Sequence, residues 1–565
     1  MSRFLRTALL VMAALAAALT CYVGVTLPPR AISLDGTVPP NLVFGAYHVH
    51  SARSDGSGTP DEIAAAAARA GLRFVVLTDH GDATRAPDPP TYRHGVLTID
   101  AVEINTLAGH VVALGLDRPA PYPLAGEARD VVDDIHRLGG WAVVAHPDSP
   151  NADLRWRDWN VAYDGVEWLN ADSEWRDETP ERLIWAALRS IVRPAESVAS
   201  LFGRPSRTLQ RWDAASQLRP IVTLAGADAH ARFDWRKAGE PRPATIIARP
   251  RYEDMFRTLV QAVVVDALTG DAATDATRIL DALEHGRTYT VVRGFATPGV
   301  FEFAADQSGT TTIMGGRLPN MGPMRMHAAV SSAGGADLTL LRGGAVIARG
   351  KGSVEFVGPP SPGAYRVEAY LPGNGMPWIV SNPIYAGPVS IDVAPPPVAA
   401  PAVVALAADR GWRTEHDAAS TAELSMNPQQ LSLAFALGSG APAGQYAAAV
   451  SEVEGPDAFD GVRFIARADR PMRVSVQVRL LGGQRWRRSV YVDTTARAIA
   501  VSLQDFEPAG VSSILRPTAA RVRSLLFVID TLNATPGTRG TLTLESIALS
   551  KAPADAGGLP PTFER

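Results

Sequence analysis

The part of this sequence richest in side chains that could do chemistry is YHVHSARSDG, residues 47–56. His48 and His50 are two residues apart, and Asp55 follows in a run of small residues. Side chains two apart on a β-strand project to the same face, so both imidazoles would lie together where the strand meets a loop. Imidazole is a common ligand of zinc, manganese and iron. The spacing therefore indicates either a metal site or a pair of hydrogen-bonded histidines.

Further candidate ligands follow later strands. Predicted strands end in FVVLTDH, AVEIN, WAVVAHP and IVTLAGADAH, and GHVVALG opens another. Because strand ends of an α/β domain converge on one rim, we expect these side chains to meet in one pocket. Nine of the eleven histidines fall between His48 and His285, which is the enrichment that a metal site requires. The candidate metal ligands are His48, His50, Asp55, His80, Glu103, His110, His146, Asp228 and His230.

The elements that must position these residues form an α/β pattern over residues 41–298, with mostly parallel strands. Thr59-Pro60-Asp61-Glu62 is a capping box before an alanine-rich helix, and Gly71 ends that helix. This helix and its two flanking strands make one β-α-β unit. We expect a second helix over 126–138, mostly helical structure over 178–218, and strands at 96–104, 110–114, 165–169 and 221–225.

The texture changes after Pro298 to short β-branched runs between Gly and Pro turns. This spacing predicts a small β-sandwich over 299–392, a Pro/Ala linker over 393–408 and a larger β-sandwich over 409–552. The larger sandwich resembles jelly-roll domains that often bind carbohydrate. It would serve either as a scaffold or as a glycan contact.

The N-terminal segment, residues 1–30, has the layout of an export signal, with Arg3 and Arg6 before an uncharged apolar run. The run is also long enough to span a bilayer. A cleaved signal peptide and a retained membrane anchor both place the body outside the cytoplasm, in the periplasm or cell envelope or secreted. Cys21, the only cysteine, lies in this run, so any metal must be held by His, Asp and Glu. A formal net charge of −4 gives no footprint for nucleic-acid binding.

The ordered set H-x-H-S-x-x-S-D-G, T-D-H, E-I-N, A-H-P and G-A-D-A-H resembles the motifs of the PHP superfamily, the polymerase and histidinol phosphatase family. The resemblance covers residues 44–295, and its closest likeness is to stand-alone metal-dependent phosphoesterases. It implies a distorted (β/α)7 barrel with metals at the carboxyl ends of the strands. The expected fold class is therefore α/β, with this barrel followed by two all-β sandwich domains.

The resemblance also implies a distribution of the ligands over three metal sites. It gives the first site to His48, His50, Glu103 and Asp228, the second to Glu103, His146 and His110, and the third to Asp55, His80 and His230. Glu103 would thus bridge two metals. Two or three divalent transition metal ions, manganese, iron or zinc, are expected, and the expected catalytic residues are Glu103, Asp228 and His146.

The function expected from these features is hydrolysis of a phosphate ester, small or polymeric, by a metal-activated hydroxide at a trinuclear site. Arg53, Asn170, Arg232 and His94 are candidate substrate-binding residues. One alternative is an extracytoplasmic metal-containing protein that binds a glycan or envelope polymer without turnover. Another is metal-assisted hydrolysis of a carboxyl ester or a C–N bond.

Overall fold

The structure is a computed structural model that describes residues 3–34, 37–232, 250–330, 335–388, 402–440, 444–453, 459–510, 512, 514 and 516–551. The chain divides into two compact units, one of Met1–Pro119 with Val132–Ile391 and the other of Ala120–Val131 with Asp392–Arg565. The first unit is mixed α/β and extends into a β-sandwich, and the second is a β-sandwich. The expected fold class is confirmed at this level, while the seven-fold barrel stays a prediction.

The α/β part of the first unit contains two sheets. One has the order β11-β10-β9-β8-β7-β4, and the other contains the run β13-β12-β2-β3-β6-β5. Val49 in β2 bridges Ala229 just after β11, so the two sheets meet there. The strands are β2 (Leu42–Val49), β3 (Phe74–Leu77), β4 (His80–Gly81), β5 (Thr91–Arg93), β6 (Val96–Asp100), β7 (Val102–Thr106), β8 (Gly109–Leu114), β9 (Trp141–Val144), β10 (Gly165–Asn170), β11 (Val222–Gly226), β12 (Val260–Val264) and β13 (Thr288–Val291).

Parallel pairing brings several strand ends to one rim. The pairs β2–β3, β3–β6, β9–β10 and β10–β11 are all parallel. The residues of β2, β3 and β9 are buried throughout, as the apolar sequence runs predict. Side chains that follow these strands consequently lie on the same side of the unit.

The helices of the described chain begin with α1 (Arg3–Val25), the one described helix that is long and apolar enough to cross a membrane. The predicted capping box of α2 is confirmed, since Thr59 Oγ1 accepts from Glu62 N at 3.3 Å and Glu62 Oε2 accepts from Thr59 N at 2.8 Å. The helical expectation for 178–218 is confirmed as well. The remaining helices are α2 (Pro60–Arg69), α3 (Ala128–Arg137), α4 (Ala171–Arg176), α5 (Pro180–Ser190), α6 (Pro194–Ala199), α7 (Ser206–Ser216), α8 (Tyr252–Thr258) and α9 (Ala272–Glu284).

The prediction of one continuous strand over 96–104 is wrong. The chain leaves one sheet after β6, turns at Ala101 and enters the other sheet as β7. Both halves contain consecutive buried residues, so hydrophobic periodicity cannot reveal the change of sheet. The consequence is functional, because β7 brings Glu103 directly beside His80 of β4.

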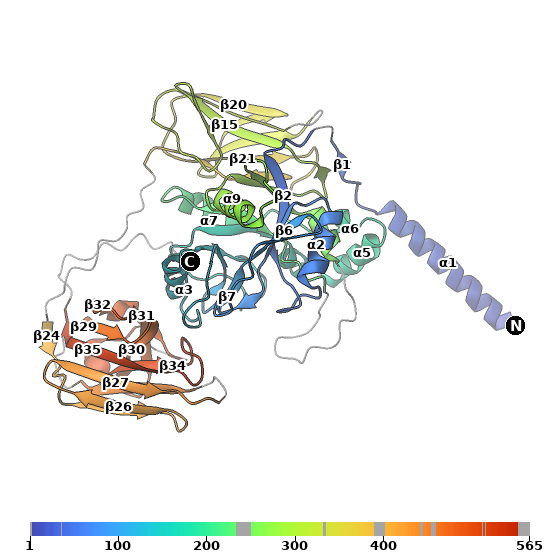
Figure 1. Cartoon of the computed structure of the whole chain (residues 1–565). Coiled ribbons are helices and arrows are strands. Elements are labelled where there is room, and N and C mark those ends of the chain that lie inside the picture. The colour runs from blue at the N-terminus through green and yellow to red at the C-terminus, as the bar shows by residue number, and fades with distance from the viewer. Residues whose placement is uncertain are drawn as a thin grey trace. The chain divides into compact units, whose positions relative to one another are not determined.

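The β-sandwich of the first unit has two layers, and one of them continues the α/β sheet. Strand β22 (Ile379–Ser381) pairs with β13, so β19-β18-β21-β22 and β13-β12-β2 form one eleven-stranded sheet. The opposing layer is β16-β15-β17-β20, and Figure 1 shows β15 and β20 stacked beyond β21. The other strands are β1 (Ile32–Ser33), β14 (Ala296–Thr297), β15 (Phe301–Gln307), β16 (Thr310–Ile313), β17 (Met324–Val330), β18 (Asp337–Arg342), β19 (Ala345–Lys351), β20 (Ser353–Gly358), β21 (Gly363–Tyr370) and β23 (Ile384–Ala386).

The second unit is a two-sheet antiparallel sandwich around an aromatic and aliphatic core that includes Phe435, Phe464 and Phe527. Its sheets are β26-β27-β35-β29-β32, joined by β24, and β25-β28-β34-β30-β31-β33. Residues 393–401 of the predicted linker lie outside the described residues. The strands are β24 (Ala402–Ala405), β25 (Trp412–His416), β26 (Thr421–Met426), β27 (Gln430–Ala436), β28 (Tyr446–Glu452), β29 (Gly461–Ala468), β30 (Met472–Leu480), β31 (Arg485–Val492), β32 (Arg497–Ser502), β33 (Glu507–Pro508), β34 (Val522–Asp530) and β35 (Arg539–Ser550).

A buried ionic network fastens the sandwich layer of the first unit to its α/β part. Arg366 of β21 makes a two-pronged contact with Asp213 of α7, with N···O distances of 2.6 and 2.7 Å. Its Nη1 also donates to Glu368 at 2.7 Å. Arg366 is 2% exposed, so removing it would leave two buried carboxylates short of a cation.

We expect Arg366→Leu to lower the free energy of unfolding of the first unit by about 3 kcal/mol, the lower end of the cost of breaking a buried ion pair. Denaturant titration followed by tryptophan fluorescence measures this, because Trp212 lies under the guanidinium at 5.1 Å. Arg349→Ala, at an exposed position of β19, is the matched control. Equal destabilisation by the two variants would contradict the assignment.

Candidate metal centre

The first histidine pair lies where β2 meets its loop, as the strand pattern predicts. His48 is the penultimate residue of β2 and His50 follows the strand, and both side chains are fully buried. Their Nε2 atoms are 3.1 Å apart. Two imidazoles that are this close and this buried need further polar partners. These partners come from other strand ends.

Glu103 lies at the centre of the cluster and uses its two oxygens on different partners. Oε2 lies 3.3 Å from His48 Nε2, from His50 Nε2 and from His80 Nδ1. Oε1 lies 2.8 Å from His110 Nδ1 and 2.9 Å from His146 Nε2. The side chain of Glu103 is 1% exposed, so this carboxylate joins two groups of imidazoles out of contact with bulk water.

Asp228 and Asp55 complete the cluster from two other segments. Asp228 Oδ1 lies 3.2 Å from His50 Nε2 and 3.5 Å from His48 Nε2. Asp55 lies 3.3 Å from both His230 Nε2 and His50 Nδ1. His50 and His230 stack with ring centroids 4.3 Å apart and planes 8° apart. The structure therefore brings all nine candidate ligands together, and their role in metal binding stays a prediction.

The backbone at the cluster is strained at three candidate ligands. His48, His146 and Asp228 have φ values of 63°, 31° and 44°, in the left-handed region that side chains disfavour. Each such residue costs about 1–3 kcal/mol and persists only where the surroundings impose it. Strain of this kind clusters at functional sites, so three strained residues in one cluster are an observation independent of the residue types.

The donor set fits divalent transition metals. Three groups have ligand atoms within 4.8 Å of one another: His48, His50 and Asp228; His50, Asp55 and His80; and His80, Glu103 and His110. Within the described residues, the Nδ1 atoms of His50, His80 and His146 are buried and make no hydrogen bond, although carboxylate oxygens of Asp55 and Glu103 lie 3.3 Å from the first two. A buried imidazole nitrogen without a hydrogen bond is costly, and a metal ion is one partner that would satisfy it.

Electrostatics in the cluster are set by the buried carboxylates. Burial opposes protonation of His48, yet Asp228, Glu167 and Glu103 outweigh burial and hold its pKa well above the usual value. Burial likewise favours the neutral form of Asp55, but His230, His50 and His80 lower its pKa. The buried carboxylates thus favour positive charge in the cluster. They keep protons on the imidazoles, and they would equally favour a metal cation in place of those protons.

Glu167 is a member of the site that sequence reasoning missed. Its Oε1 lies 2.5 Å from His48 Nδ1, and its Oε2 accepts from the backbone N–H of His146 at 2.7 Å. A carboxylate behind a ligating histidine fixes the ring and its tautomer. Gly226 makes room for it, because a Cβ there would lie 2.5 Å from Glu167 Oε1. The only signal in the sequence was a charged residue inside the apolar run GVEWLN of β10.

Asp79 was also missed, and it orders the loop that carries Asp55. It accepts from Ser51 N at 2.7 Å, from Ser51 Oγ at 2.6 Å and from Ser54 Oγ at 2.7 Å. Gly56 is required at the turn, since a Cβ there would lie 2.1 Å from the His50 carbonyl oxygen. Tyr252 of α8 donates to that same carbonyl at 2.8 Å. The loop thereby returns Asp55 to the cluster.

Two cavities open beside the cluster. The first, which we call the arginine cavity, measures about 140 Å³ and is lined by His80, Asp79, Arg53, Arg85 and Arg118 among others. The second, the acidic cavity, measures about 50 Å³ and is lined by His146, Glu167, Asn170, Asp148 and Glu174 among others. Arginine is suited to contacts with phosphate oxygens, so the two cavities differ in the ligand parts that they would accept.

The four candidate substrate residues have different surroundings. Arg53 lines the arginine cavity and pairs with Asp100 at 3.3 Å and with Asp88. Asn170 lines the acidic cavity, but its amide is used, donating to Glu167 at 2.8 Å and accepting from Ser173 N at 3.0 Å. Arg232 is half-buried two residues after His230. His94 is exposed and lies 3.0 Å from Asp61 of α2.

Comparisons with known proteins give only distant likenesses. No protein-family model and no curated protein matches the chain. A two-domain protein containing a predicted PHP-like metal-dependent phosphoesterase from Bacteroides vulgatus is similar at 15% identity, over 62% of this chain and 99% of that one, with a TM-score of 0.27. A family 11 carbohydrate-binding module of a Clostridium thermocellum cellulase is similar at 12% identity, over 27% and 97%, with a TM-score of 0.22. Scores this low do not establish a shared fold.

We expect Glu167→Gln to weaken metal retention about 10–100-fold, the usual effect of losing a carboxylate behind a ligating histidine. In the parent protein, His48 Nδ1 and the His146 N–H each face a carboxylate oxygen of Glu167. The glutamine amide has only one oxygen, so its NH2 group must face one of these two. Competition with a chelator, read by metal content, measures the effect. Glu302→Gln, at an exposed position of β15, is the control, and equal retention by both variants would refute the role.

We expect Glu174 of the acidic cavity to make stability depend on pH. Burial raises the pKa of Glu174 to about 7 from an ordinary 4.5. The folded protein thus binds this proton more tightly than the unfolded chain, so the stabilisation is complete below pH 4.5 and is lost as pH rises through about 7. Glu174→Gln, which keeps the acceptor for Gly203 N, should flatten the fall in melting temperature over that interval. Exposed Glu181→Gln should leave the profile unchanged.

Proposed function

We propose that this chain is a metal-dependent phosphoesterase of the PHP type, with two or three manganese, iron or zinc ions bound by the nine clustered residues. The observation that carries the proposal is the division of Glu103 between two groups of imidazoles, three on Oε2 and two on Oε1. A carboxylate placed this way is suited to bridging two cations. Neighbouring metal ions would lower the pKa of a water toward neutrality and neutralise charge on a phosphoryl group.

The chain's own residues would then hold and orient the reactants. Glu167 fixes the ring of His48 through Nδ1, which leaves Nε2 directed at Glu103 and Asp228. Asp79 fixes the loop of Asp55 through three hydrogen bonds. Because these contacts hold the candidate ligands in place beforehand, the groups need not rearrange during the reaction. Such preorganisation is the main source of electrostatic catalysis. Burial of His48, Glu103 and Asp228 keeps bulk water away from the same atoms.

Substrate binding is assigned to the rim. The arginine cavity would receive the non-bridging oxygens of the phosphate, with Arg53 turning from Asp88 and Asp100 to the ligand. Glu174 in the acidic cavity is suited to protonate a leaving group, since its raised pKa leaves it partly protonated near neutrality. Arg232, Asn170 and His94 remain candidates of lower rank because their surroundings give them other partners or exposed positions.

The proposed location is outside the cytoplasm, with the N-terminal apolar helix as an export signal or an anchor. Arg6, close to the N-terminal end of the apolar span Phe4–Val25, favours the N-terminus on the cytoplasmic side. The rival function, glycan or polymer binding without turnover, differs in one measurable respect. A binder would show saturable association and no phosphate release from any ester.

The test combines metal content with turnover. We expect the purified protein to contain transition metal and to hydrolyse phosphate esters in a substrate panel, and His48→Ala and Asp228→Ala to lower both metal content and kcat/KM by at least about 100-fold. Both variants remove a side chain that faces Glu103 or His50. Metal analysis by mass spectrometry and phosphate release are the measurements.

The matched control is His285→Ala, which removes an exposed histidine at the end of α9 and should keep metal and activity. A protein free of transition metal would sink the proposal. Full activity in His48→Ala and Asp228→Ala would do the same.

A further inference from the structure

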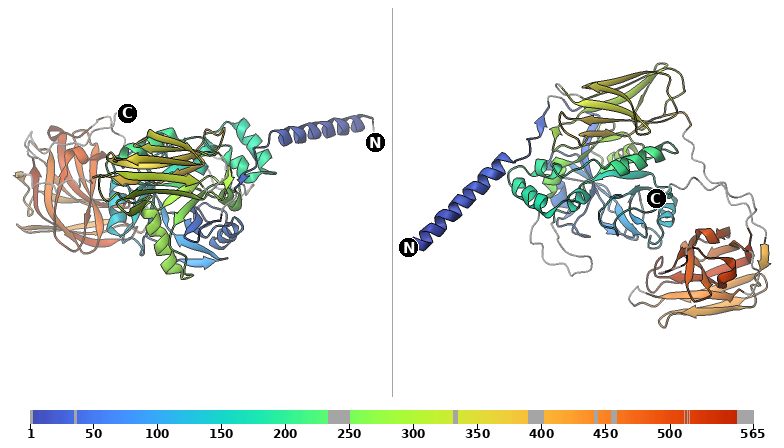
Figure 2. Two further views of the ribbon diagram at one scale, coloured as in Figure 1. Left: turned by 90° about the horizontal axis from the view of Figure 1, so that it is seen from above. Right: turned by 180° about the vertical axis from the view of Figure 1, so that it is seen from behind.

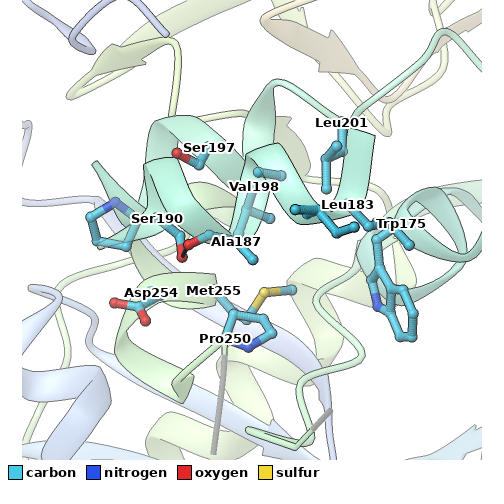
Figure 3. A pocket seen from close by; sticks show the side chains of 13 residues that line it. Trp175, Leu183, Ala187, Ser190, Ser197, Val198, Leu201, Pro250, Asp254 and Met255 are labelled. Carbon is cyan, nitrogen blue, oxygen red and sulfur yellow. Dashed lines mark hydrogen bonds between the residues drawn. The ribbon is translucent and has the colours of Figure 1, made fainter. Parts of the chain in front are cut away.

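An apolar cavity of about 300 Å³ lies between α4, α5, α6 and α8, away from the proposed ligands. Figure 3 shows Leu183 and Ala187 of α5, Val198 of α6 and Met255 of α8 turned toward it. Its size is at the lower end of cavities that bind small ligands, roughly 300–1,000 Å³. A cavity with walls of this kind accepts hydrocarbon and offers little to a polar ligand.

Two polar side chains in the wall, Ser190 and Asp254, are already paired, while the buried Oγ of Ser197 has no hydrogen-bond partner. Ser190 Oγ donates to the carbonyl of Ala187 in its own helix at 2.7 Å. Asp254 accepts from Arg251 through both the backbone N–H and the guanidinium, at 3.1 and 2.9 Å. Neither of these two groups is directed at a ligand, so Ser197 Oγ is left as a single polar contact and recognition in this cavity depends mainly on apolar contact.

The opposite side of α5 holds the end of the apolar N-terminal helix. Tyr22 of α1 packs on Trp185 with ring centroids 4.6 Å apart. Arg189 donates to Thr26 Oγ1 at 3.3 Å, and Arg193 donates to the carbonyl of Pro28. Figure 2 shows α1 standing clear of the unit except at this end. The contacts of α1 with the body are thus made at its last turn and the residues after it.

The length of α1 fixes the depth of α5 if α1 spans a membrane. Its apolar span, Phe4–Val25, has 22 residues and measures about 33 Å at ~1.5 Å per residue. The hydrocarbon core of a bilayer is about 30 Å thick, so the whole span is needed to cross it. Thr26 and Pro28, which follow at once, already contact Arg189 and Arg193, so there is no spacer and α5 lies at headgroup depth.

The surface of α5 fits that position. Ile184 of α5 and Ile191 at its C-cap, seven residues apart and therefore on one side, are 54% and 70% exposed, and Val192 just after the helix is 59% exposed. Ile184 also lines the cavity, which places this exposed stripe at its mouth. Arg189 and Arg193, which hold Thr26 and Pro28, bring positive charge to the C-terminal end of α5, where it would match anionic headgroups. Exposed apolar residues with arginines nearby in the chain are typical of a surface that enters the membrane interface.

We propose that the cavity between α4, α5, α6 and α8 binds the acyl chain of a bilayer lipid that enters past Ile184. This proposal does not depend on the phosphoesterase activity or on bound metal, since no proposed ligand lines the cavity. It depends on α1 being retained in the mature protein.

The experiment uses the full chain in vesicles of anionic and zwitterionic phospholipid that contain a trace phospholipid with a photoreactive group on its acyl chain. After irradiation, mass spectrometry of peptides locates the label. We expect label on α1 and on the cavity walls in α5, α6 or α8. Ala187→Trp should lower label on the walls about tenfold and leave label on α1 unchanged, because the indole occupies the space that methylene groups need.

The matched control is Ala273→Trp, an equal change at an exposed position of α9, which should label like the parent protein. Ile184→Asn at the mouth is a second variant with the same expected loss, in case Ala187→Trp unfolds. Label on α1 with none on the walls would overturn the proposal, as would undiminished wall label in both variants. A mature protein whose intact mass lacks α1 would overturn it too.

Discussion

The contact on which the proposed centre depends is that of one buried carboxylate, Glu103, with five imidazoles. Its two oxygens address different histidines, and the histidines come from β2, β4, β8 and the segments after β2 and β9. A negative charge this deep is stable only if cations or protonated imidazoles surround it. The sheets therefore have to hold five imidazoles from four separate segments within hydrogen-bond distance of a single side chain.

The fold meets that requirement through backbone features more than through side-chain packing. Positive φ values at His48, His146 and Asp228 turn the backbone sharply at the rim. Each of these side chains therefore faces the cluster, whereas a regular strand would direct it elsewhere. Gly56 and Gly226 provide space that any Cβ would fill. The stability of the remaining sheets, with their fully buried strands, compensates for this strain.

The sequence was informative where local rules decide the outcome. Capping of α2, the parallel strands and the position of the candidate ligands at strand ends follow from patterns within ten residues. The role of Glu167 could not be predicted, because a glutamate inside an apolar strand indicates no particular function until its spatial neighbours are known. The role of Asp79 could not be predicted because it acts through hydrogen bonds to a loop distant in the sequence. The break at Ala101 and the pairing of β13 with β22 involve choices of sheet, which periodicity does not encode.

The pairing of β13 with β22 bears on how such a chain could be divided. In register, Tyr289 faces Ser381 and Val291 faces Ile379, and all four residues of β13 are buried. A fragment that stopped near Pro298 would uncover the hydrogen-bonding groups of a hydrophobic strand and turn it into a template for aggregation. The sandwich layer that follows thus covers the edge of the α/β part, and gene fusions or truncations would have to be cut after β23.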